Sequence, residues 1–364
     1  MNLRAGHNAR MDYFSLAKPL LYMIEPEEAH DMALRALACG MLPRQPEFKS
    51  DRLKTKLAGL QLDNPVGLAP GFDKNAETIN RIFDHGFGFV ECGTVTPKWQ
   101  AGNPRPRLFR LKKQQAVINR LGFNNRGLEP FVERLQLRTS KGIVGANIGK
   151  NKDSEDAVAD YVTCLEAVYA HADYVTINIS SPNTEGLRDL QEQDALIKLV
   201  GSVYGARKKQ IEAGQKKKPI FVKIAPDLND AQKEAIADIA HKRNLDGLIV
   251  SNTTITRPDV GELPPRMQQG GLSGKPLFAL STDVLRDMYR LTKGKTPLIG
   301  VGGIASADDA YAKIKAGASA IQLYSALVYQ GMGLVTKIKR GLDAKLEQDG
   351  FKSIRDAVGV EAEA

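Results

Sequence analysis

Residues 297–325 read PLIGVGGIASADDAYAKIKAGASAIQLYS and contain one complete structural repeat. An apolar run closed by glycines (297–303) is followed by a helical pattern (306–316) and a second apolar run (319–325). Apolar runs without polar alternation are typical of parallel strands that are buried on both faces. The stretch therefore predicts a strand, a glycine-rich loop, a crossover helix and a neighbouring parallel strand.

Six more apolar runs of this kind precede the stretch, all of them after residue 60. They are PVGLAP (65–70), GFVECGT (88–94), GIVGANIG (142–149), DYVTINIS (173–180), PIFVKIA (219–225) and DGLIVSN (246–252). Helical patterns at 154–170 and 229–243 lie between them. Eight strands that alternate with helices indicate the α/β class and a (β/α)8 TIM barrel. The two long inserts, 95–140 and 253–278, are then expected to be loops over one mouth of the barrel.

The segment before the first strand has a different character. Residues 11–46 are rich in Leu, Met and Ala and predict two helices that are divided near Glu25–Pro26. Apolar residues of the second helix recur at helical spacing, namely Ala29, Met32, Ala33, Leu37 and Met41. We therefore expect a small, amphipathic N-terminal helical extension at 1–46 and a catalytic barrel domain at 47–364.

Composition and charge narrow the class of protein. The chain has 364 residues, with 51 Lys and Arg against 42 Asp and Glu, and 42% of its residues are hydrophobic. These values are typical of a globular protein and exclude a disordered or fibrous chain. Cys39, Cys92 and Cys164 lie far apart, which argues against a disulfide framework or a zinc site, and we expect no metal. No apolar stretch approaches the roughly 20 residues of a membrane span, so we expect attachment to a membrane surface at most.

The positive charge is concentrated in two segments. Residues 98–126 contain eight Lys and Arg and no acid, interleaved with Gly, Asn and Phe. A loop of this kind can draw an anionic small molecule into a cleft, and it can also bind RNA or phosphate groups. The second segment, 207–218, has the composition of a solvated helix end and loop. Charge alone does not choose between these partners.

Polar residues or glycines close every predicted strand at its carboxyl end. They are Lys74, Thr94, Asn147, Asn178, Lys223, Asn252, Gly303 and Ser325. Barrel enzymes have their active sites at this end, so we expect one shared site at the mouth. The loops after the last two strands, which include GVGG (300–303), predict a mononucleotide phosphate site. The same loop satisfies a dinucleotide pattern, but the acid expected about 20 residues later is missing.

Two further features leave the chemistry open. Lys223 in IFVKIA can act as a Schiff-base nucleophile, as a fixed cation beside a cofactor that becomes anionic, or as a structural lysine paired with a core carboxylate. The cluster NISSPNT (178–184) can be a simple turn, but Asn119, Asn124 and Asn252 supply further amides. A set of Asn side chains suits a planar, amide-containing ligand, because each Asn amide can donate to the acceptors of the ligand and accept from its donors.

The motifs taken together resemble the dihydroorotate dehydrogenase family. The resemblance covers nearly the whole chain and rests on NPVGLAPGFDKNAE (64–77), GTVTPKWQAGNPRPRLFRL (93–111), INRLGFNN (118–125), ANIGKNK (146–152), NISSPNT (178–184), SNTT (251–254), GGLSGKPL (270–277), GVGGI (300–304) and LYSALVYQG (323–331). Ser181, in place of a loop cysteine, and the N-terminal helices resemble the class 2, quinone-using branch. This implies FMN-dependent oxidation of (S)-dihydroorotate to orotate in de novo pyrimidine biosynthesis, with a membrane quinone as the electron acceptor.

The resemblance also implies roles for individual residues. Ser181 would be the base that takes the C5 proton while the C6 hydride passes to the flavin, and Thr184 would relay that proton. The substrate would contact Lys74, Asn119, Arg120, Leu121, Gly122, Phe123, Asn178, Asn183, Asn252 and Thr253. One FMN per subunit would contact Ala69, Pro70, Gly71, Phe72, Asp73, Lys74, Thr94, Asn147, Asn178, Lys223, Ser251, Gly274, Gly303, Tyr324 and Ser325. The quinone tunnel would include His30, Arg110 and Tyr324.

The sequence also bears on where the protein is located and on three alternative functions. The resemblance to bacterial members implies a peripheral protein on the cytoplasmic face of the inner cell membrane, without a nucleic-acid partner. A soluble class 1 dehydrogenase would carry a cysteine base and lack the N-terminal helices. A flavin-dependent RNA reductase would need a catalytic cysteine and an RNA-binding C-terminal domain. A Schiff-base aldolase that uses Lys223 would leave the Asn set unexplained, and it would be colourless.

Overall fold

The computed structural model describes residues 13–264, 267 and 269–362, and it contains a closed barrel of eight strands. All eight strand pairings are parallel. The strands follow one another around the barrel as β3 (Val66–Leu68), β4 (Phe89–Val95), β7 (Ile143–Ile148), β8 (Tyr174–Asn178), β9 (Ile220–Ile224), β10 (Gly247–Val250), β12 (Leu298–Val301) and β13 (Ala320–Leu323). Each coincides with one of the eight predicted runs, so the (β/α)8 prediction is confirmed.

The amino end of the barrel interior is filled by large side chains. Phe89, Tyr174 and Phe221 belong to one buried cluster, and the rings of Tyr174 and Phe221 meet edge to face at 5.4 Å. Gly145 makes this packing possible, because a Cβ at that position would lie 2.1 Å from the Tyr174 ring. With its amino end plugged, the barrel has room for a ligand only toward the carboxyl ends of its strands.

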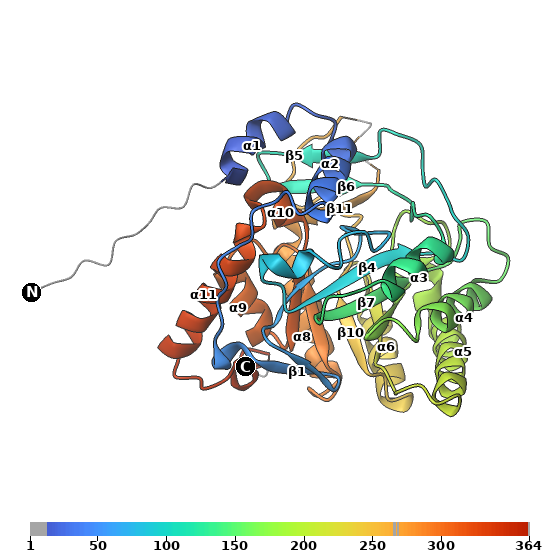
Figure 1. Cartoon of the computed structure of the whole chain (residues 1–364). Coiled ribbons are helices and arrows are strands. Elements are labelled where there is room, and N and C mark those ends of the chain that lie inside the picture. Colours follow the sequence, from blue (N-terminus) through green and yellow to red (C-terminus); the bar gives the residue numbers. More distant parts are fainter. Residues whose placement is uncertain (1–12, 265–266, 268, 363–364) are drawn as a thin grey trace, which may run out of the picture.

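Helices surround the barrel as the sequence predicts for an α/β fold (Figure 1). Asn229 begins α6 with a capping box, and the Ser306 hydroxyl caps the first turn of α9. The helices are α3 (Leu128–Gln136), α4 (Ala157–Val168), α5 (Gln193–Glu212), α6 (Asp230–Lys242), α8 (Phe278–Leu291), α9 (Ala307–Lys315), α10 (Ser325–Gln330) and α11 (Gly333–Gln348). Short 3-10 helices are η1 (Asp51–Leu53), η2 (Ile82–His85), η3 (Arg188–Gln191), η4 (Lys275–Leu277) and η5 (Ile354–Ala357), and a hairpin pairs β1 (Thr55–Leu57) with β2 (Leu60–Leu62).

The two expected N-terminal helices are α1 (Tyr13–Leu21) and α2 (Pro26–Ala38). The Glu25 carboxylate caps α2 by accepting the backbone N–H groups of Glu27 and Glu28. Leu34 and Leu37 belong to the same apolar cluster as the outer faces of the barrel strands, whereas α1 buries none of its residues. The division of the chain into domains at 46/47 stays a prediction, and residues 1–12 lie outside the described part.

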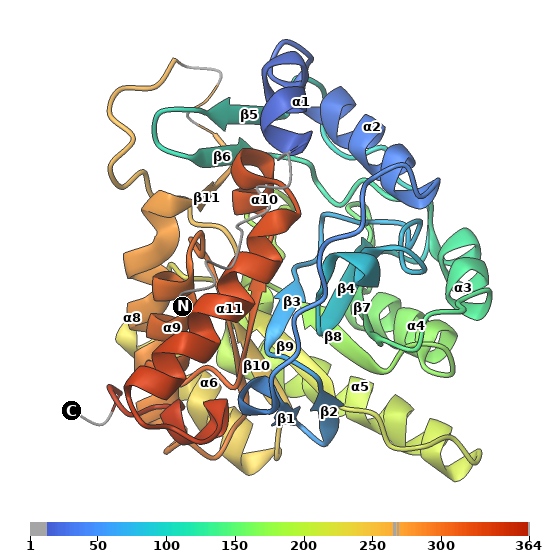
Figure 2. The ribbon, with the colours of Figure 1, turned by 60° about the vertical axis from the view of Figure 1, so that its left-hand side comes forward.

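The prediction that the two inserts are only loops is incomplete. They contribute β5 (Leu108–Leu111), β6 (Ala116–Asn119) and β11 (Gly271–Gly274), which form an antiparallel sheet in the order β11-β6-β5. The first insert also contains α3. This small sheet lies with α1 and α2 at one end of the barrel in both views (Figures 1 and 2). The mouth is therefore covered by ordered structure drawn from three separate parts of the chain.

Candidate active site

A cavity of about 1290 Å³ extends from the carboxyl ends of the barrel strands to α1 and α2. Its volume exceeds the roughly 300–1,000 Å³ of pockets for a single small ligand. Most of the predicted site residues line it: His30, Ala69, Pro70, Gly71, Phe72, Lys74, Thr94, Arg110, Asn119, Leu121, Gly122, Phe123, Asn178, Ser181, Asn183, Lys223, Ser251, Asn252, Thr253, Gly274, Gly303, Tyr324 and Ser325. Asp73, Arg120, Asn147 and Thr184 lie outside this lining.

The floor of the cavity is a network of side-chain hydrogen bonds between neighbouring strands. Asn178 Nδ2 donates to Thr94 Oγ1 at 2.8 Å and to Asn147 Oδ1 at 3.2 Å. Thr94 Oγ1 in turn donates to Asn147 Oδ1. Asn147 thus lies beneath Thr94 and holds it in place. The three polar strand ends that the sequence predicted to meet are brought together.

Glu91 anchors this network from inside the barrel, and sequence reasoning missed it. Its carboxylate is fully buried and accepts hydrogen bonds from Asn147 Nδ2 at 2.7 Å, Tyr174 OH at 3.0 Å and Gln322 Nε2 at 2.8 Å. A buried carboxylate needs such partners to remain in place. The signal was present as a single charge in the otherwise apolar strand FVECGT.

Ser181 lies in a loop whose amides bond across the cavity. The backbone N–H of Asn183 donates to Ser181 Oγ at 3.2 Å, and Asn183 Nδ2 donates to Asn119 Oδ1 at 3.1 Å. From the other side, Asn252 Nδ2 donates to Ser180 Oγ at 3.0 Å. The predicted set of Asn residues is therefore assembled around one space.

Thr184 ends this segment and is buried. Its hydroxyl is buried and has no hydrogen-bond partner among the residues that the structure describes. An unpartnered buried hydroxyl is costly unless a ligand, a water molecule or a moving proton uses it. The relay role that the resemblance implied for Thr184 stays a prediction.

Arg188 and Asp227 clamp the two loops together and were also missed. Arg188 donates to the backbone oxygens of Ser180 at 3.1 Å and Thr253 at 3.0 Å, and to Asp227 Oδ2 at 2.9 Å. Asp227 also accepts from the hydroxyl of Thr254. Arg188 follows NISSPNT by four residues, but the sequence gives no indication that its partner lies on another loop.

Two lysines bring positive charge to the cavity. Lys223 is buried and Lys74 is half-buried, and neither ammonium group forms a hydrogen bond with another described residue. Burial lowers the pKa of Lys223, and the neighbouring Glu91 opposes that shift. Burial also lowers the pKa of Lys74, against the acids Glu27 and Asp31. Two cations without direct partners in the described part of the chain favour an anionic ligand.

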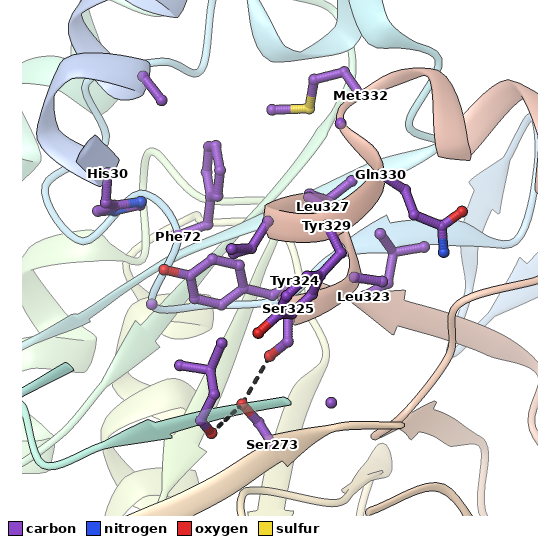
Figure 3. Close-up of a pocket in the computed structure, with 18 of the residues that line it drawn as sticks. His30, Phe72, Ser273, Leu323, Tyr324, Ser325, Leu327, Tyr329, Gln330 and Met332 are labelled. Atoms are coloured by element: carbon purple, nitrogen blue, oxygen red, sulfur yellow. Dashed lines mark hydrogen bonds between the residues drawn. The ribbon is translucent and has the colours of Figure 1, made fainter. Parts of the chain in front are cut away.

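The glycine loop after β12 has the geometry of a phosphate cradle. Gly302 and Gly303 have φ values of 117° and 74°, which side chains rarely adopt, and a Cβ on Gly303 would meet the backbone of Phe278 at 2.6 Å. Ser325 and Ser273 line the same cavity, and Ser325 Oγ donates to Ser273 Oγ at 2.8 Å (Figure 3). The loop can therefore bring backbone N–H groups close to an anion.

The outer part of the cavity is aromatic and apolar. Phe72 contacts His30 and Tyr324 edge to face, at ring-centre distances of 5.4 Å and 5.6 Å (Figure 3). His30 Nε2 is buried without a hydrogen-bond partner among the described residues. Burial, reinforced by the charge of Lys74, lowers the pKa of His30 to about 3. His30 is therefore a neutral polar group at physiological pH.

Three of the predicted residues form contacts with other parts of the chain, and of these only Arg110 also lines the cavity. Arg110 donates to the backbone oxygens of Leu21 and Ile24, so it joins β5 to the end of α1 and to the turn before α2. Asp73 accepts from the backbone N–H of Thr78 at 2.7 Å. Arg120 stacks on the ring of Phe109 at 4.8 Å. The ligand contacts that the resemblance implied for them stay predictions.

Within the described residues, no helix combines the length and apolar character that a bilayer span requires. Three large apolar side chains of α1 are nevertheless exposed: Tyr13, Leu16 and Leu20 are 58%, 63% and 68% exposed. Met23, in the turn after α1, is 83% exposed. Together these four residues form an apolar surface beside the cavity, which we call the α1 surface.

Comparison with known proteins gives a consistent result. A family model described as dihydroorotate dehydrogenase matches residues 52–346. A dihydroorotate dehydrogenase (quinone) of Azorhizobium caulinodans is 50% identical over 354 residues, which cover 96% of this chain and 99% of the relative. One from Parvibaculum lavamentivorans is 53% identical over 352 residues, with the same coverage. The crystal structure of the dihydroorotate dehydrogenase of Eimeria tenella in complex with ferulenol superposes with a TM-score of 0.89 at 42% identity, over 95% of this chain and 99% of that one.

Proposed function

The chain belongs to the dihydroorotate dehydrogenase family, and we propose that its large cavity holds FMN, dihydroorotate and a membrane quinone together. The protein is a quinone-dependent dihydroorotate dehydrogenase, which oxidises dihydroorotate to orotate in pyrimidine biosynthesis. The observation that carries the proposal is the cavity itself. It joins a polar, amide-lined floor with two cations to an apolar channel under α1 and α2.

The residues of the floor fit FMN. The glycine loop at Gly302 and Gly303 suits the phosphate, and the bonded set of Thr94, Asn147 and Asn178 suits the polar edge of the flavin ring. Lys223 would stand beside the ring as a fixed cation. When bound, FMN would supply two-electron redox chemistry between the substrate and the quinone.

Ser181 would act as the base for the substrate. Oxidation of dihydroorotate removes a proton from C5 and a hydride from C6, and a C5–C6 double bond forms. The proton would go to Ser181 Oγ, whose position is set by the N–H of Asn183. A serine is a weak base by itself, so the proton must pass on through a hydrogen-bonded path. The buried, unpartnered hydroxyl of Thr184 is the candidate for that path.

Amides and one cation would hold the substrate. The side chains of Asn119, Asn183 and Asn252 offer both donors and acceptors around one space, which matches the alternating N–H and C=O groups of a pyrimidine ring. Lys74, which lies in the cavity without a direct partner among the described residues, would pair with the substrate carboxylate. Residues 120–123, with Thr253, would cover the ring.

The apolar end of the cavity would receive the quinone. His30 and Tyr324 offer polar groups to a quinone oxygen, while α1, α2 and α10 supply apolar walls. The α1 surface would rest on the lipid at the cytoplasmic face of the bacterial inner membrane, so that the quinone enters without crossing water. Arg110 would hold the entrance in shape through its bonds to Leu21 and Ile24.

The test is to mix the purified protein with dihydroorotate under anaerobic conditions and to follow the flavin absorbance. Bleaching is the expected result, because it requires the cofactor, the substrate and the hydride step together. A yellow protein that does not bleach would refute the substrate assignment. A protein that remains colourless after FMN is added would refute the cofactor assignment and would favour an aldolase that uses Lys223.

A further inference from the structure

Lys313 is a buried cation that the reaction described above does not use. It lies on α9, its side chain is 0% exposed, and it does not line the cavity. Its Nζ donates to Ser281 Oγ at 2.6 Å and lies 5.3 Å from the centre of the Phe278 ring. A lysine this deeply buried is unusual without a carboxylate partner.

No carboxylate in the described part of the chain forms an ion pair with Lys313. Asp283 and Asp309 favour its charged form only through space. Burial dominates and lowers the pKa of Lys313 well below the ordinary lysine value. Burial thus disfavours the charged form of Lys313 in the protein alone, and an anion bound nearby would favour that form.

Ser281 connects Lys313 to the glycine loop. Its Oγ lies 3.1 Å from the backbone oxygen of Phe278 and 3.2 Å from that of Gly302, and its single O–H is shared between these two acceptors. A Cβ on Gly302 would lie 2.5 Å from that same Oγ, so the loop packs directly on the serine. A single hydroxyl group therefore links the ammonium group to the back of the loop.

The bond to Gly302 also determines how the loop presents its next N–H. In a planar trans peptide, the C=O and the following N–H point in opposite directions. With the Gly302 oxygen held by Ser281 behind the loop, the N–H of Gly303 points toward the cavity side. That N–H forms no hydrogen bond with another described residue, and Gly303 lines the cavity.

We propose that Lys313 and Ser281 are positioning residues for a phosphate dianion: they hold the Gly302–Gly303 peptide with its N–H toward the phosphate, and the bound dianion favours the charged form of Lys313 behind the loop. The inference rests on the proposed binding of FMN. It adds that specificity for the phosphate depends on residues that do not touch the ligand. A dianion at the loop supplies the negative charge that the surroundings of Lys313 lack.

The test compares FMN with riboflavin, which lacks the phosphate. Dissociation constants for both are measured by flavin fluorescence on the flavin-free full-length chain. In Lys313→Met, which keeps the length of the side chain, we expect FMN to bind about tenfold more weakly or worse, because the loss of one charge several ångströms away acts on a dianion. Riboflavin binding should stay within about twofold, since it has no dianion to lose.

Two further variants separate this role from a structural one. Lys315→Met removes a charge from the same helix on the surface side, where Lys315 pairs with Glu361, and it should change neither dissociation constant. Ser281→Ala keeps the charge of Lys313 but releases the Gly302 oxygen, and it should weaken FMN selectively by a smaller factor. It also provides the test if Lys313→Met does not fold.

The outcomes are distinct. Equal weakening of FMN and riboflavin in both Lys313→Met and Ser281→Ala would show a structural role and overturn the inference. Unchanged FMN binding in these variants would overturn it too. If the wild type binds neither flavin, the proposed cofactor fails, and this inference fails with it. A selective loss for FMN supports the inference.

Discussion

The floor of the cavity is built from buried polar side chains that bond to one another, whereas its roof consists of two short helices with exposed apolar side chains. Asn147 and Asn178 in the floor are 0% and 4% exposed, and each bonds to a neighbouring strand. In the roof, Leu16 and Leu20 are 63% and 68% exposed, and α1 has no buried residue. The same cavity therefore has one rigid wall and one lightly held wall.

The way each wall is attached explains the difference. The floor is part of the closed barrel, where every strand has two neighbours. The bonds that join α1 and the turn after it to the barrel domain include Lys18 Nζ to the Tyr329 oxygen at 2.9 Å and Tyr22 OH to the Val328 oxygen at 3.3 Å. Hydride transfer requires the reacting atoms to be held within a fraction of an ångström. A long apolar ligand instead requires lining helices that can move to admit it. Because the two walls are attached so differently, we expect mutations to affect flavin reduction by dihydroorotate and reduction of the quinone separately.

The largest effect is expected in the floor loop, from Ser181→Ala. Removing the proposed base should reduce turnover about 100-fold or more, because proton removal by a positioned group contributes at least that factor. The FMN content should stay normal, since the floor network does not include the Ser181 hydroxyl. Turnover is measured as orotate formed, and FMN content by absorbance. Ser180→Ala is the matched control, because it removes a neighbouring hydroxyl that bonds only to amides of the loop and floor, and near-normal turnover of Ser181→Ala would refute the assignment.

Deleting residues 1–24 should affect the roof alone. With α1 removed, reduction of a quinone should slow about tenfold or more, because the ligand loses one wall of its channel and its orientation. The rate at which dihydroorotate bleaches the flavin, measured by anaerobic stopped flow, should stay within about twofold. The deletion keeps Glu25, which caps α2, and Glu27, which joins α2 to the barrel. Unchanged quinone kinetics would contradict the proposed channel, and slower flavin reduction would mean that the floor depends on the roof.

A smaller effect is expected on membrane attachment. Leu16→Ser and Leu20→Ser should each weaken binding to phospholipid vesicles by about threefold to tenfold, because each removes part of the apolar area that would enter the lipid. Their melting temperatures should stay unchanged, since both side chains are exposed in the free protein. Leu137→Ser, at a 66% exposed leucine after α3, is the control for a general loss of surface apolarity. Equal weakening by all three variants would argue against the α1 surface as the attachment site.

The same contrast explains how far the sequence could predict the molecule. Apolar runs mark the strands of a parallel barrel, and their carboxyl ends meet by geometry, so the amino-acid sequence alone groups Thr94, Asn147 and Asn178. The covering sheet was not predictable in this way, because Gly271 pairs with Asn119, 152 residues away in the chain. The sequences of β5 (LFRL) and β11 (GLSG) contain no pattern that indicates which strand each pairs with.

Residues that act through distant partners were missed for the same reason. Glu91 is visible as a charge in an apolar strand, but its three donors come from three other strands. Arg188 looks like an ordinary helix-flanking arginine, yet it bonds to two separate loops. Local patterns identify which residues face the mouth, whereas the bonds that hold them there depend on tertiary pairing.

The smallest expected effect, on the KM for quinone, concerns a buried ionic link between roof and barrel. Glu27 on α2 is buried and bonds to Arg107 with its two oxygens, at 2.7 Å from Nη2 and 3.0 Å from Nε. Arg107 also donates to the oxygen of Asn103, whose side chain donates to the oxygen of Asn183 in the Ser181 loop. Roof and active-site loop are therefore connected through a chain of side chains that begins at Glu27.

Glu27→Gln keeps the shape of this link but removes its charge. Quinone KM should rise by about twofold to fivefold, since a hydrogen bond to a charged group is worth about 1.5–3 kcal/mol and the amide retains part of it. Burial alone would raise the pKa of Glu27, but Arg107 and Arg105 lower it below its ordinary value of 4.5. Its stabilising contribution is therefore present above about pH 4.5 and is lost as the pH falls through the lower folded value.

Hydrogen exchange of the α2 amides distinguishes this link from a merely structural contact. At pH 7, exchange in α2 should be faster in Glu27→Gln than in the wild type, and the difference should shrink when both are compared below the folded pKa of Glu27, where the wild-type carboxyl is protonated too. Thermal melting of the barrel should change little. A difference that is the same at both pH values would exclude the charge of Glu27 as the cause. A rise in the KM for dihydroorotate as large as that for quinone would show that the roof and the floor are coupled through Arg107 and Asn103. The two half-reactions would then not be separable by mutation.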